Sequence, residues 1–254
     1  MAAAKGSAKR TRVEARSMMP LHSPPFGPPP YPMLECRMLM VELRADPAEI
    51  RRITPEPLEP ADRDRLFAFV ADNSQLSHSL RYHEAAILQR VRYGDREGVT
   101  TPYIWTSTDT AMLAGRELYG MPKLMCDDGA LEVDANEVYG RLEKYGRTMM
   151  ELSIVIDRAG RIGDLPFGSD WVFVRHIPTP DPRRPALRQL VWIGLTDFAL
   201  QECWLGRGWA GLGHPGSSGL HRLGAAAAGS AWYGRFSWML GDAEILEETE
   251  IPAR

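Results

Sequence analysis

Several features that would assign this chain to a common class of protein are absent. No apolar run approaches the ~20 residues that span a bilayer, so the sequence predicts no transmembrane helix. The formal net charge of −3 provides no basic excess for nucleic acid or for a membrane surface. The basic start of the chain has no apolar core and does not resemble a secretory signal. We therefore expect neither nucleic acid nor a membrane as a partner.

Cysteine and metal-ligand patterns are equally sparse. The chain has three cysteines, Cys36, Cys126 and Cys203, and this odd number does not describe a disulfide framework. It has no CxxC pair and no HxxxH spacing among its histidines, so we expect no metal site. Free thiols are typical of reducing compartments, and we expect the protein to be cytoplasmic.

The chain divides into a polar tail and one domain. Residues 1–19 are small, polar and basic, which predicts a disordered N-terminal tail. Residues 20–32 are dense in proline and allow two interpretations, a polyproline linker or an ordered arm that packs on the domain. Residues 20–250 contain the expected domain, and their length suits a single β domain.

Alternating apolar segments separated by turn residues predict a mostly β fold of the α+β class. Between residues 131 and 157, the spacing of these segments is typical of an antiparallel meander. Residues 84–91 also suit a helix on propensity. Strands are expected at 33–45, 66–72, 82–93, 99–108, 131–135, 138–146, 148–157, 186–206 and 231–248.

Two short helices and one long loop region complete this prediction. Asp46-Pro47 offers an N-cap acceptor and a first-turn proline, which predicts a short helix after Asp46. Asp109 is expected to cap a second helix that runs to Gly120, before Pro122 breaks it. Residues 158–185 are rich in proline, glycine and arginine, and we expect them to form surface loops.

The most unusual residue is Lys123, which follows Pro122 and lies between the apolar residues Met121 and Leu124. If Lys123 points inward, burial penalises the ammonium and favours the neutral amine, which is the form that attacks carbonyl groups. A lysine that lays its stem over apolar surface and keeps its ammonium in water fits the same pattern. Spacing alone leaves both interpretations open.

A series of motifs in chain order resembles the acetoacetate decarboxylase family. Gly115-Arg116-Glu117-Leu118, followed by Pro122-Lys123, resembles the active-site motif of that family. The further matches are Pro20-Leu21 with Ser23-Pro24, Thr54-Pro55-Glu56-Pro57-Leu58-Glu59, Tyr82-x-Glu84, Glu202-Cys203-Trp204-x-Gly206 and Ala243-Glu244. Each motif is weak alone, but their order and spacing make the resemblance specific.

The resemblance implies a single-domain antiparallel β-barrel or cone around the motif lysine, and a homo-oligomer. It assigns to Lys123 a Schiff base with a keto acid, whose iminium accepts the electrons released when carbon dioxide leaves. Glu84 matches the pocket glutamate of the family, which handles protons or holds the substrate. No cofactor is implied, because the lysine itself provides the electrophilic catalyst.

Three further residues take their expected places from the resemblance. Arg116 and Glu117 match as motif residues of the substrate pocket, and we expect them to be structural, as an internal ion pair on the helix, more than catalytic. Trp105 matches an apolar residue of the pocket, although packing in the core explains it equally well.

Two departures from the family pattern affect the pocket. The second lysine of the family motif is Leu124 here, which removes a neighbouring cation and leaves burial as the activating factor. The arginine of the first strand is Cys36 here, and Arg37 follows it. Adjacent strand residues point to opposite faces, so Arg37 could serve only if a bulge shifts the register. These changes predict a less polar pocket, and a larger or less acidic substrate than acetoacetate.

Composition alone allows an interaction module that acts through the proline-rich residues 20–32, and three other functions also stay open. The leading hypothesis is a lyase that decarboxylates a β-keto acid through Lys123, with a small-molecule carbonyl compound as its partner. A second is a relative of the aldolase-dehydratase type that uses the same lysine. A third, motivated by Leu124 and Cys36, is a non-catalytic protein that binds a small molecule on the same fold.

Overall fold

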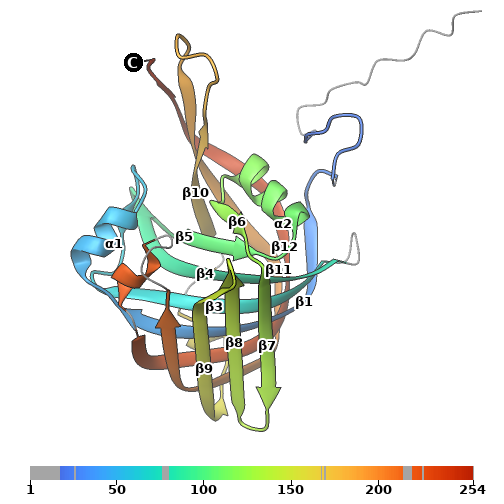
Figure 1. Ribbon diagram of the computed structural model, residues 1–254, viewed down its shortest axis with the longest axis vertical. Helices are drawn as coiled ribbons and strands as arrows, with labels where there is room; N and C mark the ends of the chain where they lie inside the picture. The colour runs from blue at the N-terminus through green and yellow to red at the C-terminus, as the bar shows by residue number, and fades with distance from the viewer. Residues whose placement is uncertain are drawn as a thin grey trace, which may run out of the picture.

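The computed structural model describes residues 18–253 except 26, 76–79, 167, 169, 214–218 and 225. Within these residues the chain forms one large, mostly antiparallel sheet that closes on itself (Figure 1). The predicted mostly β class with a few short helices is confirmed. Most of the expected N-terminal tail lies outside the described residues, but Met18 is described and is only 2% exposed.

A closed ring of strands forms the body of the molecule. Its order is β10-β5-β4-β3-β1-β12-β11, and β10 also pairs with β11, which closes the ring. The pairs are antiparallel except for β10 with β5. In chain order the ring strands are β1 (Tyr31–Arg44), β3 (Arg65–Gln75), β4 (Leu80–Tyr93), β5 (Arg96–Thr106), β10 (Asp170–Ile177), β11 (Ala186–Leu212) and β12 (Ala226–Ile251).

Strand β10 corrects the expectation that residues 158–185 are surface loops. The run Asp170–Ile177 contains Trp171, Val172 and Phe173, and the last two are buried between β5 and β11. The proline, glycine and arginine residues that suggested loops flank this run on both sides. The closing strand of the ring was therefore missing from the sequence-based prediction.

A second layer covers one outer face of the ring. It consists of β7 (Asp128–Asp134), β8 (Glu137–Lys144) and β9 (Arg147–Ala159), which confirm the predicted meander and extend the sheet from the far end of β11. In Figure 1 these strands stand across β1, β3 and β4. Leu39 and Val41 of β1 face this layer and pack with Val138, Leu142 and Ile154. The opposite face of β1 is thereby left to the interior of the ring.

Short helices and strands connect these layers. Helix α1 begins as predicted, because the side chain of Asp46 accepts a hydrogen bond from the backbone N–H of Ala48 at 2.8 Å. The second helix is capped by Thr108 rather than Asp109. The elements are α1 (Pro47–Ile53), β2 (Glu59–Pro60), α2 (Asp109–Ala114), the π-helical turn η2 (Gly115–Tyr119), β6 (Lys123–Met125), and the 3-10 turns η3 (Ile162–Asp164) and η4 (Leu220–Leu223). None of the helices in the described part of the chain has the length and apolar character to cross a bilayer.

The proline-rich segment packs on the domain at both ends. Met18 and Tyr31 lie in one buried cluster with Tyr119 and Phe173, and the Tyr31 and Tyr119 rings meet edge to face at 6.5 Å. The hydroxyl of Tyr31 donates to the carbonyl of Gly27 at 2.8 Å. This arrangement matches the ordered arm, not the free linker, of the two interpretations that composition allowed.

Candidate active site

Lys123 points into the interior of the ring. It begins β6, which pairs in parallel with the end of β5 so that Lys123 lies opposite Ile104. The residue is 6% exposed, whereas the next residue, Leu124, is 46% exposed on the other face of the strand. The interpretation of Lys123 as a lysine that keeps its ammonium in water therefore does not match its position.

The motif before Lys123 forms a compact turn that fixes the lysine backbone. Residues 115–119 follow α2 as a π-helical turn, a local widening that often occurs at functional sites. Gly120 then adopts a left-handed conformation (φ 76°), and a Cβ there would meet the backbone of Arg175 at 2.6 Å. The guanidinium of Arg116 donates to the backbone carbonyl of Lys123 at 3.0 Å. Arg116 thus holds the strand that carries the lysine.

Glu84 of β4 is the ion-pair partner of Lys123. The Nζ of Lys123 lies 2.5 Å from Oε2 of Glu84, and the two side chains are only 8% and 13% exposed. A charge that is withdrawn from water to this extent needs such a partner. The carboxylate is also within reach of the proton that the ammonium must lose before the amine can attack a carbonyl carbon.

Two further polar side chains lie beside this pair. The ring of Tyr82 is 5.8 Å from Nζ of Lys123, and Asn73 of β3 lies opposite Tyr82 in the strand register. Burial, with the nearby Glu84 carboxylate as a second cause, raises the pKa of Tyr82 well above its usual range. Tyr82 is therefore a neutral hydroxyl that can donate a hydrogen bond to a bound carbonyl group. The motif Tyr82-x-Glu84 contained this signal, but the sequence assigned no role to Tyr82 or Asn73.

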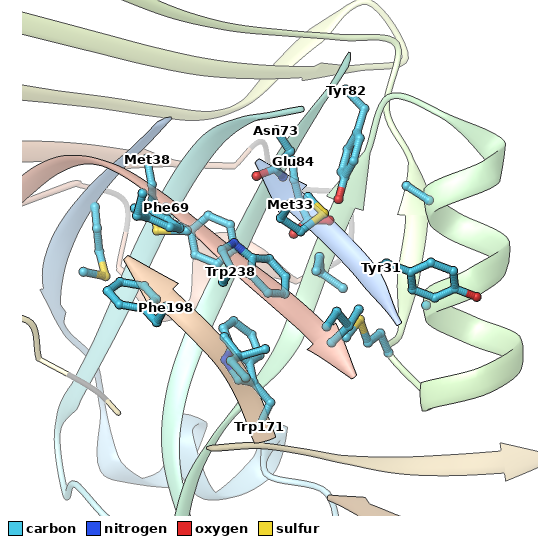
Figure 2. A pocket seen from close by; sticks show the side chains of 18 of the residues that line it. Tyr31, Met33, Met38, Phe69, Asn73, Tyr82, Glu84, Trp171, Phe198 and Trp238 are labelled. Carbon is cyan, nitrogen blue, oxygen red and sulfur yellow. The ribbon is translucent and has the colours of Figure 1, made fainter. Parts of the chain in front are cut away.

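The ion pair lies at one end of a cavity inside the ring. Figure 2 shows Glu84, Asn73 and Tyr82 at this end, with Trp238 at the centre and Phe198 and Trp171 at the far end. Most of the lining is aromatic or aliphatic. Among the described residues that line the cavity, Lys123 is the only cation. The structure thus combines one amine and one carboxylate with a large apolar space.

Cys36 and Arg37, the two adjacent residues of the first strand, lie on opposite faces of β1. Cys36 is fully buried next to Met33 and Tyr82, and burial raises the pKa of its thiol to about 12. Arg37 lies on the opposite face of β1 and pairs with Asp72 of β3. A register shift does occur in β1, but it lies between Met33 and Cys36, so it does not turn Arg37 into the cavity.

The remaining expected pocket residues also lie outside the cavity lining. Glu117 lies near Arg175, and no ion pair joins it to Arg116 in the described part of the chain. Trp105 is 1% exposed and stacks on Tyr103 in the core beneath the second layer. Of the two interpretations that the sequence left open for Trp105, pocket residue or core residue, its packing matches the core residue.

In the described part of the chain, no three histidine, cysteine or acidic side chains lie close enough together to hold a metal ion. The chemistry that this arrangement can supply is nucleophilic attack by a buried amine, with a carboxylate to accept and return protons. Comparison with known proteins identifies the family.

A family model described as acetoacetate decarboxylase matches residues 18–249. The chain therefore belongs to the acetoacetate decarboxylase family, a family of lyase-type enzymes. Acetoacetate decarboxylase 1 of Bradyrhizobium diazoefficiens is 27% identical over 198 residues, which cover 76% of this chain and 78% of the relative. The acetoacetate decarboxylase of Chromobacterium violaceum is 27% identical over 220 residues, which cover 84% of each chain.

Solved structures share the fold. An acetoacetate decarboxylase-like enzyme from Sphingomonas wittichii superimposes with a TM-score of 0.83 at 22% identity, over 92% of this chain and 99% of the other. The enduracididine biosynthesis enzyme MppR, solved with the condensation product of pyruvate and imidazole 4-carboxaldehyde, has a TM-score of 0.78 at 22% identity. That match covers 95% of this chain and 98% of MppR.

Proposed function

We propose that this protein decarboxylates a β-keto acid through a Schiff base on Lys123. One observation carries the proposal: Nζ of Lys123 lies inside the apolar cavity, 2.5 Å from Oε2 of Glu84. Family membership supports a lyase of this general type. The neutral hydroxyl of Tyr82 and the amide of Asn73 are the polar groups beside the pair that can orient a carbonyl group.

The proposed reaction has balanced steps. Glu84 accepts a proton from the Lys123 ammonium, and the lone pair of the resulting amine attacks the keto carbon. Loss of water gives an iminium, which is an electron sink. The bond between the α carbon and the carboxylate then breaks, its electron pair enters an enamine, and carbon dioxide leaves. The α carbon takes up a proton, and water hydrolyses the iminium to release the ketone and the amine.

Trapping with borohydride tests this proposal. The protein is incubated with acetoacetate, pyruvate and several longer β-keto acids, borohydride is added, and any adduct is mapped by mass spectrometry. We expect a reduced adduct on Lys123, release of carbon dioxide from at least one keto acid, and loss of both in Lys123→Met. The control is Lys144→Arg, at a lysine outside the cavity lining whose ammonium donates to the carbonyl of Met125 in β6, because arginine keeps a donor there. A folded protein that gives no adduct and no turnover would favour a non-catalytic binding protein.

A second candidate function is aldol condensation followed by dehydration, with the same lysine. The observation that favours it is that the cavity lining continues from the Lys123–Glu84 pair to the aromatic side chains of Trp238, Phe198 and Trp171, against which a second carbonyl compound could lie. MppR, which shares the fold, has been solved with a condensation product of pyruvate bound, and this supports the second candidate. Incubation with pyruvate and an aromatic aldehyde, followed by mass spectrometry, distinguishes a condensed product from carbon dioxide release.

A further inference from the structure

The charged side chains of the cavity lie at one end, and mostly apolar side chains line the other end. Its charged and amide side chains, Lys123, Glu84 and Asn73, come from β6, β4 and β3. The opposite wall comes mainly from β11 and β12, and apart from Cys203 and Tyr233 its side chains there are aliphatic or aromatic and carry no charge. Figure 2 shows this separation, with Phe198 and Trp171 far from the carboxylate of Glu84. A bound molecule with its carbonyl at Lys123 must therefore extend its other end over apolar side chains.

An irregularity in β11 turns one of these side chains toward the cavity. The register of β11 with β12 shifts between Thr196 and Ala199, and Asp197 has a positive φ of 53°. Such a bulge re-aims the side chains that follow it. Phe198 lies within the shift, lines the cavity, and stacks on Phe236 at 5.5 Å between ring centroids. The stacked pair is partly exposed, so it has apolar surface that a ligand can still cover.

Trp238 completes the wall and packs against a buried residue of β1. It lies between the polar end and Phe198 in Figure 2, and it packs against the cluster that contains the buried Cys36. Cys36 occupies the position where the family resemblance placed an arginine. A neutral thiol under an indole thus supports an apolar surface at the place where a cation was expected.

The absence of a second cation limits the ligand. Arg37 pairs with Asp72 on the other face of β1, and Lys123 is the only cation among the described residues that line the cavity. A charged group beside Phe198 or Trp238 would lose water without gaining a partner, which is costly. A phenyl ring or an alkyl chain at the same place gains about 25 cal/mol per Å² of apolar surface buried.

We infer that the substrate is a carbonyl compound with an aryl or long alkyl group beyond its reactive carbon, held by Phe198 and Trp238. This inference rests on the proposed function for the direction of binding, and it names the substrate class of that site. For a β-keto acid, 3-oxo-3-phenylpropanoate represents the class and acetoacetate represents the short alternative.

Binding of two neutral ketones tests the substrate class separately from the chemistry. Dissociation constants of 4-phenylbutan-2-one and butan-2-one are measured by ligand-observed NMR in the full chain. We expect the phenyl compound to bind about tenfold tighter or more, because one tenfold step is about 1.4 kcal/mol and burial of a phenyl ring exceeds it. Phe198→Ala should reduce this ratio about threefold or more and leave butan-2-one binding nearly unchanged. Tyr145→Ala, which removes a ring that is 76% exposed, is the matched control.

The outcomes separate the two proposals. The preference for the phenyl compound should persist in Lys123→Met, since the wall does not depend on the lysine. The unmodified protein could prefer the phenyl compound and yet form no borohydride adduct on Lys123. That result would refute the Schiff base and retain the ligand class. Equal binding of the two ketones, or a preference that Phe198→Ala does not change, would overturn the substrate class even if acetoacetate forms an adduct. If Phe198→Ala does not fold, Phe198→Leu and Trp238→Phe provide the same comparison.

Discussion

The stem of Lys123 occupies space that only a glycine at position 115 leaves open. A Cβ atom at Gly115 would lie 2.7 Å from Cδ of Lys123, 3.0 Å from Cε and 3.3 Å from Cγ. The carbonyl of Gly115 also accepts the backbone N–H of Met121 at 2.9 Å, which closes the turn that leads to the lysine. The π-helical turn therefore sets both the start of β6 and the path of its reactive side chain.

Gly115→Ala should displace Lys123 without unfolding the protein. Gly115 has helical backbone angles (φ −57°, ψ −46°) that alanine adopts freely, so the added methyl group acts on the lysine stem. A shift of about 1 Å at a reacting group can cost about a hundredfold in rate. We expect borohydride adduct formation to slow by tenfold to about a hundredfold, with an unchanged circular dichroism spectrum. Gly163→Ala, at a glycine with no atom within 4 Å of its added Cβ, is the control and should have no effect.

The Lys123–Glu84 pair predicts a specific non-additivity in stability. Lys123→Met leaves the Glu84 carboxylate buried without its cation, which costs about 3 kcal/mol for a pair this well buried. Lys123→Met combined with Glu84→Gln removes both charges, and we expect the free energy of unfolding to recover by about 2 kcal/mol. Urea unfolding of both single variants and the double variant measures this coupling. Strictly additive effects would show that the two side chains do not interact in solution.

Cys36 predicts a loss of stability at alkaline pH. Burial raises the pKa of its thiol from 9.0 to about 12, so above pH 9 the unfolded chain releases a proton that the folded chain keeps. The stability that Cys36 contributes is complete below pH 9 and declines as pH rises toward 12. We expect the free energy of unfolding to fall more steeply between pH 9 and 10.5 than in Cys36→Val, by up to about 1.4 kcal/mol per pH unit. Parallel slopes for the two proteins would contradict this assignment.

The sequence predicted the paired residues at the chemical end of the site but not the shape of the cavity. Lys123 and Glu84 could be matched because short motifs preserve them, and β3 and β4 could be located from their apolar runs. Strand β10 could not, since its apolar core is only a few residues long and lies between proline-rich and glycine-rich flanks. Without β10 no closed ring could be inferred, and Trp171 could not be placed in the wall.

Side-chain direction was the second limit. Trp105 and Ile104 are adjacent and both buried, because β5 has a core on each face, so the pattern of burial does not reveal which one faces the cavity. The direction of the Arg37 side chain could not be predicted for the same reason. The face of β1 on which it lies depends on whether the bulge in β1 comes before or after Cys36. The bulge lies before Cys36, and a single sequence contains no signal for this choice.

The ordered arm predicts that two neighbouring methionines differ sharply in their effect on stability. Met18 is 2% exposed and packs with Tyr31 and Tyr119, whereas Met19 is 63% exposed. Met18→Ala should lower the free energy of unfolding by about 2 kcal/mol or more, the usual cost of truncating a buried methionine. Met19→Ala should change it by less than about 0.5 kcal/mol, as surface substitutions usually do.

Truncation extends this test to the whole arm. A chain that starts at Met18 keeps the buried contact and should unfold at nearly the same urea concentration as the full chain. A chain that starts at Tyr31 loses Met18 and also the hydrogen bond from Tyr31 to Gly27, so it should unfold at a clearly lower concentration. Because Tyr31 lines the cavity, this shorter chain should also form the Lys123 adduct more slowly. Equal stability of the two truncated chains would mean that the arm is a linker after all, and that the cavity wall near Tyr31 is complete without it.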